Sequence, residues 1–118
     1  MGKILIVDDE QGIRLLLQEV FKEEGYVVLT AETGKEALSI IKENEIDVIV
    51  IDYKLPIMNG VEVLRKLEKD GYTTPTILMS GMFEMIQKDI QDLSLVKHTL
   101  SKPFDMDDLT KQVSSLLR

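Results

Sequence analysis

Short apolar runs alternate with amphipathic stretches along the whole chain, and this alternation constrains the fold more than any other feature. The run Lys3–Val7 reads KILIV, and Val48–Ile51 is β-branched at every position. Nearly continuous apolar runs of this length are typical of strands that are covered on both faces. Between the runs, apolar residues recur at helical spacing, and there is no hairpin signal. Strands that alternate with helices predict right-handed βαβ units and a parallel sheet.

Five such units fit an α/β fold with a doubly wound, five-stranded parallel sheet in the order 2-1-3-4-5, flavodoxin-like (βα)5. The third strand is expected at the centre because it is β-branched throughout. We expect residues 1–118 to form one domain with no output domain. The predicted helix ends are a C-terminal cap at Gly25, a capping box from Thr33 to Glu36 and an N-cap at Asp105. The predicted strands cover residues 3–7, 27–31, 48–51, 76–79 and 98–100, and a fourth helix is expected somewhere within 83–93.

Composition limits the partners and the location of the protein. Its 14 basic and 21 acidic side chains give a net charge of −7, which opposes nucleic-acid binding because duplex contact needs clustered Lys and Arg. A metal cation or a partner with a basic patch is the better expectation. No apolar stretch approaches the roughly 18 residues of a membrane span, and the chain has no cysteine. We therefore expect a cytoplasmic protein that binds neither nucleic acid nor membrane.

Chemically versatile side chains stand at the ends of four predicted strands. Asp8 and Asp9 follow the first strand, Asp52 the third, Ser80 the fourth and Lys102-Pro103 the fifth. In this topology the carboxyl ends of the strands form the ligand-binding edge of the sheet. Each residue alone has an ordinary explanation, such as a helix cap, a strand end, a turn or a solvated side chain. Their shared position at the ends of four strands instead predicts a single site.

Three carboxylates that meet at one edge need compensation. Two charges about 5 Å apart repel by roughly 3 kcal/mol at an effective dielectric near 20, so one carboxyl must take a proton or a cation must lie among them. Mg²⁺ typically binds a few carboxylate oxygens, keeps some of its waters and meets phosphate oxygens. A carboxylate beside such an ion can attack phosphorus and form an acyl phosphate. This reasoning predicts a phosphoryl group on Asp52, with Lys102 offsetting its charge and Ser80 hydrogen-bonding one of its oxygens.

The residues at the strand ends, taken together, match the pattern of a particular protein family. Asp8-Asp9 after an apolar strand, Asp52 after Val48–Ile51, Ser80 and Lys102-Pro103-Phe104 together resemble the receiver domain of two-component response regulators. The resemblance covers essentially the whole chain. It implies a signalling protein that assists its own phosphorylation, and not an enzyme.

The resemblance also implies a role for each residue of the site. Asp52 would accept a phosphoryl group from a phosphohistidine, and Ser80 and Lys102 would sense the phosphorylated state. The peptide bond between Lys102 and Pro103 would be cis. Mg²⁺ is the implied cofactor, with Mn²⁺ or another divalent cation able to replace it. Its implied ligands are Asp8, Asp9, Asp52 and the backbone carbonyl of Lys54.

A narrower likeness is to the single-domain regulators of the Bacillus-type sporulation phosphorelay. It includes the segment Gln11–Arg14, Lys54 two positions after the acceptor, and Lys102–Asp105. It implies a monomer that relays phosphate from a sensor histidine kinase to a histidine phosphotransferase, with a phosphatase as a further partner. The first helix has more apolar residues than one buried face needs, so either Leu15 or Ile13 is expected to face a helical partner. The predicted partner-binding residues are Gln11, Ile13, Leu15, Met82, Pro103 and Phe104.

Three other functions are open at this point. One is a receiver cut from a DNA-binding regulator, in which phosphorylation drives dimerisation. Another is a hydrolase that works through an aspartyl phosphate. Such enzymes need a second Asp two residues after the nucleophile, where this chain has Lys54. The third is a flavodoxin-like electron carrier. No hydroxyl-rich loop follows the first strand, and Asp8-Asp9 would repel a flavin phosphate.

Overall fold

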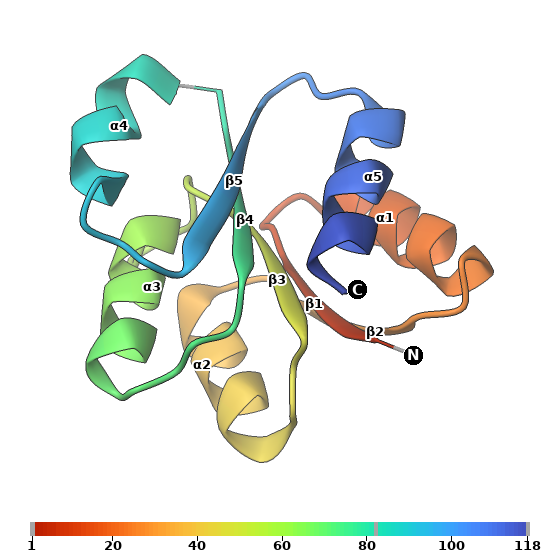
Figure 1. Cartoon of the computed structure of the whole chain (residues 1–118), viewed down its shortest axis with the longest axis horizontal. Coiled ribbons are helices and arrows are strands. Elements are labelled where there is room, and N and C mark those ends of the chain that lie inside the picture. The colour runs from red at the N-terminus through yellow and green to blue at the C-terminus, as the bar shows by residue number, and fades with distance from the viewer. Residues whose placement is uncertain (1, 82, 118) are drawn as a thin grey trace.

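The computed structural model describes residues 2–81 and 83–117, without the side chains of residues 83–86. Strands and helices alternate along these ranges, and the strands form one central sheet with helices on both faces (Figure 1). The strands are β1 (Lys3–Val7), β2 (Val27–Ala31), β3 (Val48–Asp52), β4 (Thr76–Ser80) and β5 (Val96–Ser101). The helices are α1 (Gln11–Glu23), α2 (Gly34–Glu43), α3 (Gly60–Lys69), α4 (Phe83–Ile90) and α5 (Met106–Leu116).

All five strands are parallel, in the order β2-β1-β3-β4-β5. This confirms the predicted topology and the central position of β3, whose residues are all buried. Val7, the last residue of β1, lies opposite Ile51 of β3. Asp8 and Asp52 each follow one residue later in the chain. The polar groups that end β1 and β3 therefore emerge at neighbouring positions on one edge of the sheet.

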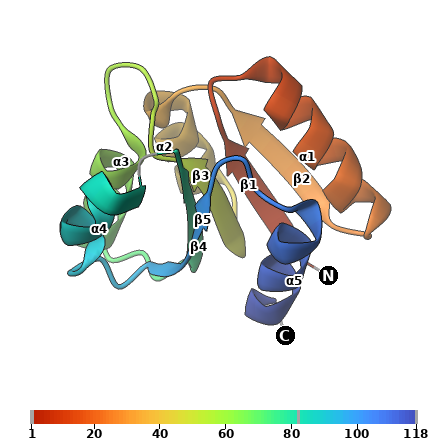
Figure 2. The ribbon, with the colours of Figure 1, turned by 90° about the horizontal axis from the view of Figure 1, so that it is seen from above.

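Each face of the sheet carries its own apolar core. Ile4 and Ile6 of β1 belong to one buried cluster, while Leu5 and Val7 belong to the other. Alternate residues of a strand point to opposite faces, and here both faces are covered, which explains the continuous apolar run. Figure 2 shows α1 and α5 on one side of the sheet and α2, α3 and α4 on the other.

Side-chain caps fix the starts of α2 and α3. The Thr33 side chain accepts a hydrogen bond from the Glu36 N–H at 3.1 Å, as predicted, but the Glu36 carboxylate binds the N–H of Glu32 and not that of Thr33. Only half of the predicted capping box is present. A complete one starts α3, where Asn59 accepts from the Glu62 N–H and Glu62 accepts from the Asn59 N–H. It fixes the direction in which α3 leaves the loop after β3.

Glycine ends α1 and α3 in the same way. Gly25 and Gly71 have φ angles of 95° and 89°. After each glycine, the next residue returns a hydrogen bond to the carbonyl five residues back, from Tyr26 to Phe21 and from Tyr72 to Leu67. This is the Schellman pattern, with left-handed backbone that glycine adopts without steric cost. The predicted cap at Gly25 is confirmed.

The C-terminal part of the sheet differs from the prediction in length. The fifth strand runs over Val96–Ser101 and not only over residues 98–100, with a register shift against β4 between Thr76 and Ile77. Helix α4 lies inside the window predicted for it, and Asp105 caps α5 by accepting from the Asp107 N–H at 2.7 Å. Among the residues described, no helix is long and apolar enough to span a membrane.

Candidate functional site

Lys102 joins the ends of three strands at the carboxyl edge of the sheet. Its Nζ lies 3.0 Å from Oδ2 of Asp8 and 3.1 Å from Oδ2 of Asp52. Its main-chain N–H donates to the Ser80 carbonyl at 2.9 Å. Asp8, Asp52 and Ser80 are buried, and the peptide bond from Lys102 to Pro103 is cis, as expected. The predicted residues at the ends of β1, β3, β4 and β5 therefore come together as one cluster.

The cluster does not balance its own charge. One ammonium serves two carboxylates, and burial deprives all three groups of water. Burial raises the pKa of Asp52 above its ordinary value, although the hydrogen bond and charge of Lys102 oppose that rise. Burial alone would lower the pKa of Lys102, but the hydrogen bonds that its ammonium donates to Asp8 and Asp52 outweigh that effect, and the pKa is raised. The site thus holds a firmly charged lysine beside the Asp52 carboxyl, which favours a neutralised form.

Asp8 is fixed through both its main chain and its side chain. Its N–H donates to the Ala31 carbonyl at 3.1 Å, and its own carbonyl accepts from the Arg14 guanidinium at 2.6 Å. Oδ1 accepts from the Glu10 N–H at 2.9 Å, and Oδ2 accepts from Lys102. A carboxylate held at this many points is positioned before any ligand arrives.

The loop after β1 adds a carboxylate that the pattern of strand-end residues does not indicate. Oxygens of Asp8, Asp9 and Glu10 lie within 4.8 Å of one another, with Asp8 buried and the other two exposed. The hydrogen bond from the Glu10 N–H to Asp8 forms an Asx-type turn. Glu10 was overlooked because it lies three residues beyond the end of the strand. An aspartate at the start of a tight loop was the signal that could have indicated it.

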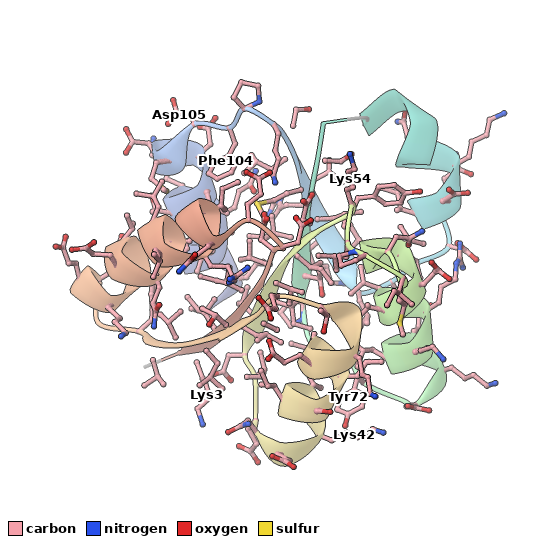
Figure 3. All side chains as sticks on the ribbon, turned by 180° about the vertical axis from the view of Figure 1, so that it is seen from behind. Lys3, Lys42, Lys54, Tyr72, Phe104 and Asp105 are labelled. Atoms are coloured by element: carbon pink, nitrogen blue, oxygen red, sulfur yellow. The ribbon has the colours of Figure 1, made fainter. Side chains whose placement is uncertain are left out.

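These residues fit a small divalent cation. Carboxylate oxygens are the donors that Mg²⁺ prefers, and Lys102 neutralises only one of the two carboxylates it contacts. The exposed carboxylates of Asp9 and Glu10 add further negative charge at the same edge. Lys54 was predicted to contribute its carbonyl. In the structure its main chain lies close enough to the Asp52 carboxyl to oppose the rise in its pKa, and its carbonyl role stays a prediction. Figure 3 places Lys54 at the end of the molecule opposite Lys3.

Main-chain hydrogen bonds hold the loop from β3 to α3, which begins directly after Asp52. The Gly60 N–H donates to the Tyr53 carbonyl at 2.8 Å. The Met58 N–H donates to the Pro56 carbonyl at 2.7 Å, which makes a γ-turn around Ile57 with a φ of 69°. This φ is rare for a β-branched residue, and the Ile57 side chain is fully exposed.

The predicted partner-binding residues surround this edge with different exposures. Gln11, Leu15 and Pro103 are exposed, while Ile13 and Phe104 are partly buried against the core under α1 and α5. Met82 lies outside the described residues. Of the two apolar residues predicted to face a partner, Leu15 is therefore the exposed one, and not Ile13. Leu16, which was not predicted as a contact, is also exposed.

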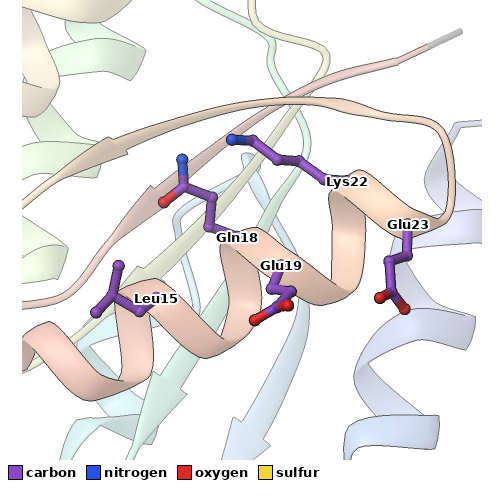
Figure 4. Close-up of a pocket in the computed structure, with 5 residues that line it drawn as sticks. All are labelled: Leu15, Gln18, Glu19, Lys22 and Glu23. Atoms are coloured by element: carbon purple, nitrogen blue, oxygen red, sulfur yellow. The ribbon is translucent and has the colours of Figure 1, made fainter.

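Leu15 also borders an open groove of about 580 Å³ along α1. In Figure 4, Gln18 and Lys22 extend to one side of the helix, and Glu19 and Glu23 lie on another. The groove therefore combines one apolar side chain with a mixed, charged rim.

With the fold and the site described, the class of protein follows. The chain belongs to the response regulator receiver domain family, whose sequence model matches residues 4–114. This confirms the resemblance inferred from the strand-end residues. Solved structures agree. The receiver domain of a Francisella response regulator has a TM-score of 0.90 at 35% identity, over 98% of this chain and 96% of that one. Response regulator TrrA of Thermotoga maritima, solved with Mg²⁺ and BeF, has a TM-score of 0.85 at 35% identity, over 98% and 99% of the two chains.

Comparison with curated proteins shows which individual response regulators the chain is similar to. Over 117 residues the chain is 39% identical to sporulation initiation phosphotransferase F of Bacillus subtilis, covering 98% of this chain and 93% of that protein. It is 35% identical to the alkaline phosphatase synthesis transcriptional regulatory protein PhoP of the same species, covering 98% of this chain and 48% of PhoP. The chain spans about half the length of the transcriptional regulatory proteins that it matches.

Proposed function

We propose that this receiver domain carries a phosphoryl group on Asp52 and passes it on in a phosphorelay. The observation that carries the proposal is the Lys102 ammonium between the buried carboxylates of Asp8 and Asp52, at the carboxyl edge of the sheet. Similarity to sporulation initiation phosphotransferase F supports the relay role. The chain is the reactant in its own phosphorylation and assists it, so it is not proposed as an enzyme.

The transfer itself is a displacement at phosphorus. An oxygen of Asp52 forms a bond to phosphorus while the bond from phosphorus to the donor histidine nitrogen breaks. The electron pair of that bond stays on the imidazole, which takes a proton from water. Lys102 already lies within 3.1 Å of the acceptor oxygen, so its ammonium is in place to offset the charge that arrives with the phosphoryl group. The Ser80 hydroxyl, carried at the adjacent strand end, is proposed to hydrogen-bond a phosphoryl oxygen.

A divalent cation is proposed as the cofactor. Asp8 and Asp9 would hold it, together with Asp52 and the Lys54 carbonyl, and Glu10 lies close enough to Asp9 to take part. When bound, Mg²⁺ would supply positive charge that offsets the phosphoryl oxygens. The contribution of the chain is to hold the Lys102 ammonium between Asp8 and the reacting carboxyl of Asp52.

The proposed partners are a sensor histidine kinase and a histidine phosphotransferase, with a phosphatase as a further possible partner. Leu15 and Leu16 expose apolar surface on α1, and Pro103 is exposed at the start of the loop after β5. An apolar patch with a charged rim suits the packing of a partner helix. The proposed docking surface is formed by Leu15, Leu16 and Pro103. It lies on the α1 side of the carboxylates of Asp8, Asp9 and Glu10.

One experiment tests the acceptor and the relay together. The wild type and Asp52→Asn are incubated with a phosphorylated histidine kinase and Mg²⁺, and then with a histidine phosphotransferase. We expect base-labile label on the wild type, onward transfer to the phosphotransferase and no label on Asp52→Asn. Full labelling of the variant at another residue would refute the assignment of Asp52.

Similarity to PhoP and other transcriptional regulators supports a second candidate, a receiver domain whose phosphorylation drives dimerisation. Gel filtration with and without acetyl phosphate separates the two. A relay carrier stays monomeric and gives its label to the phosphotransferase. A receiver of the second kind elutes as a dimer and keeps its label.

A further inference from the structure

The Arg14 side chain extends from α1 back to the loop that carries the carboxylates of Asp8, Asp9 and Glu10. Its Nη1 donates to the main-chain carbonyl of Asp8 at 2.6 Å, and its Nη2 lies 3.5 Å from a Glu32 carboxylate oxygen. The Arg14 side chain is only 15% exposed, whereas that of Glu32 is 63% exposed. The short contact to the Asp8 carbonyl is therefore the main interaction of this guanidinium, and the ion pair with Glu32 is secondary.

The position of Arg14 is a poor one for stabilising its own helix. It lies in the first turns of α1, where the helix dipole disfavours a cation. The N-cap residue, Glu10, makes no side-chain capping bond, and no acidic residue follows in the first turn of α1. A largely buried arginine at this end must gain its compensation from outside the helix. The structure provides it at the Asp8 carbonyl.

Asp8 links this contact to the reactive edge. Asp8 accepts a hydrogen bond from Arg14 at its main-chain carbonyl. Its side chain accepts from Lys102 at Oδ2 and from the Glu10 N–H at Oδ1. Rotation of the peptide unit after Asp8 would move Asp9 and Glu10, whose carboxylate oxygens lie within 4.8 Å of that of Asp8. Resting on the function proposed above, we propose that Arg14 is a positioning residue, which orients the loop Asp8–Glu10 for divalent-cation binding without contacting the cation or the phosphoryl group.

The test compares Mg²⁺ dissociation constants by calorimetry in the unphosphorylated protein, so that it does not depend on phosphotransfer. Arg14→Met keeps the apolar stem and removes every donor. We expect it to weaken Mg²⁺ binding by about tenfold, as loss of an outer-shell partner does. Arg14→Lys retains one donor for the Asp8 carbonyl and should recover most of that loss.

Arg65 offers a matched control, because it also binds a main-chain carbonyl, that of Asp89, and a carboxylate, that of Asp92. Arg65→Met should lower the melting temperature but leave the Mg²⁺ dissociation constant within about twofold. A purely structural arginine at position 14 would give the same result as Arg65. Wild-type Mg²⁺ affinity in Arg14→Met overturns the inference and leaves the proposed function intact.

A second measurement uses the wild type alone and covers the case in which Arg14→Met does not fold. The guanidinium resonances of ¹⁵N-arginine-labelled protein are followed during a Mg²⁺ titration. Those of Arg14 should shift with saturation while those of Arg65 stay fixed, and an unshifted Arg14 at saturation contradicts the inference. If the wild type binds no Mg²⁺ at all, the cation role in the proposed function fails, and this inference fails with it.

Discussion

Gly60, the first residue of α3, packs directly against the main chain of Asp52. A Cβ added to Gly60 would lie 2.5 Å from the Asp52 carbonyl oxygen and 3.1 Å from the Cα of Tyr53. Backbone atoms cannot move aside as a flexible side chain can. Gly60→Ala should therefore destabilise the fold by about 1–3 kcal/mol, the usual cost of overpacking, and should slow labelling of Asp52. Chemical denaturation and acetyl phosphate labelling measure the two effects. Gly12→Ala is the control, because a Cβ there meets nothing within 4 Å.

The raised pKa of Asp52 predicts that removing its charge increases the stability of the fold, by an amount that depends on pH. Because burial lifts the pKa above the unfolded value, the stability contributed by this group is fully present below the unfolded pKa. It is lost as the pH rises through the folded pKa. Without divalent cations, Asp52→Asn should melt higher than the wild type at pH 7, and the difference should vanish towards pH 3. Asp70→Asn is the control, because it removes the same charge from an exposed position. A lower melting temperature for Asp52→Asn at pH 7 would contradict the prediction.

Glu68 of α3 should show the opposite dependence. Its carboxylate accepts from the Ser94 N–H at 2.7 Å and from the Ser94 hydroxyl, and these bonds lower its pKa. A depressed folded pKa contributes stability above the unfolded pKa that is lost as the pH falls through the folded value. The wild type should therefore be more stable than Glu68→Gln at pH 7, and the two should converge as the pH falls. Thermal unfolding from pH 7 to pH 3 measures this, with the exposed Glu43→Gln as control.

Ile57 should be replaceable with a gain in stability. Its φ of 69° costs a residue with a Cβ roughly 1–2 kcal/mol, and its exposed side chain recovers nothing by packing. Glycine removes this cost but loses about 0.5–1 kcal/mol of unfolded-state entropy. Ile57→Gly should thus gain up to about 1 kcal/mol in urea unfolding. Gly71→Ala, at a φ of 89° in open space, should lose a similar amount. A loss on Ile57→Gly would mean that the γ-turn is not strained.

The docking surface predicts a donor-dependent defect. Leu15→Ala should slow transfer from a phosphorylated kinase or phosphotransferase by about tenfold, because truncating one of the few central residues that dominate an interface costs more than about 1 kcal/mol. Labelling by acetyl phosphate, which needs no docking, should stay at the wild-type rate. Val27→Ala trims a comparably exposed side chain on β2 and should affect neither donor. Equal loss with both donors would show damage to the fold, and no loss with a cognate donor would place the docking surface elsewhere.

Much of the fold was predictable because its signals are local. Apolar runs indicate the first four strands, and the alternation of strands with helices predicts the sheet order. The cluster of Asp8, Asp52 and Lys102 was predictable because parallel strands bring their carboxyl ends to one edge. The length of β5 was not, since its pairing with β4 depends on a register shift that leaves no mark in the residue pattern.

The loops were harder to predict, because tertiary contacts override local preference there. Asn59-Gly60 has a turn-like sequence, yet Asn59 caps α3 and Gly60 is needed for close contact with β3. Nothing in the residue type of Ile57 indicates positive φ, which β-branched side chains avoid. Arg14 was noted only as part of a segment. Its role depends on a main-chain carbonyl, and the sequence does not show where carbonyls point.

The contacts of Lys102 join residues 94 and 50 positions apart in the chain. On a ribosome, β1 and β3 are synthesised well before β5. A nascent chain that ends after β4 would bring the buried carboxylates of Asp8 and Asp52 together with no ammonium between them. That arrangement costs free energy, so the half-made sheet should stay open or protonated at this edge. Arrival of the last strand then completes the sheet and brings the Lys102 ammonium to both carboxylates in the same step.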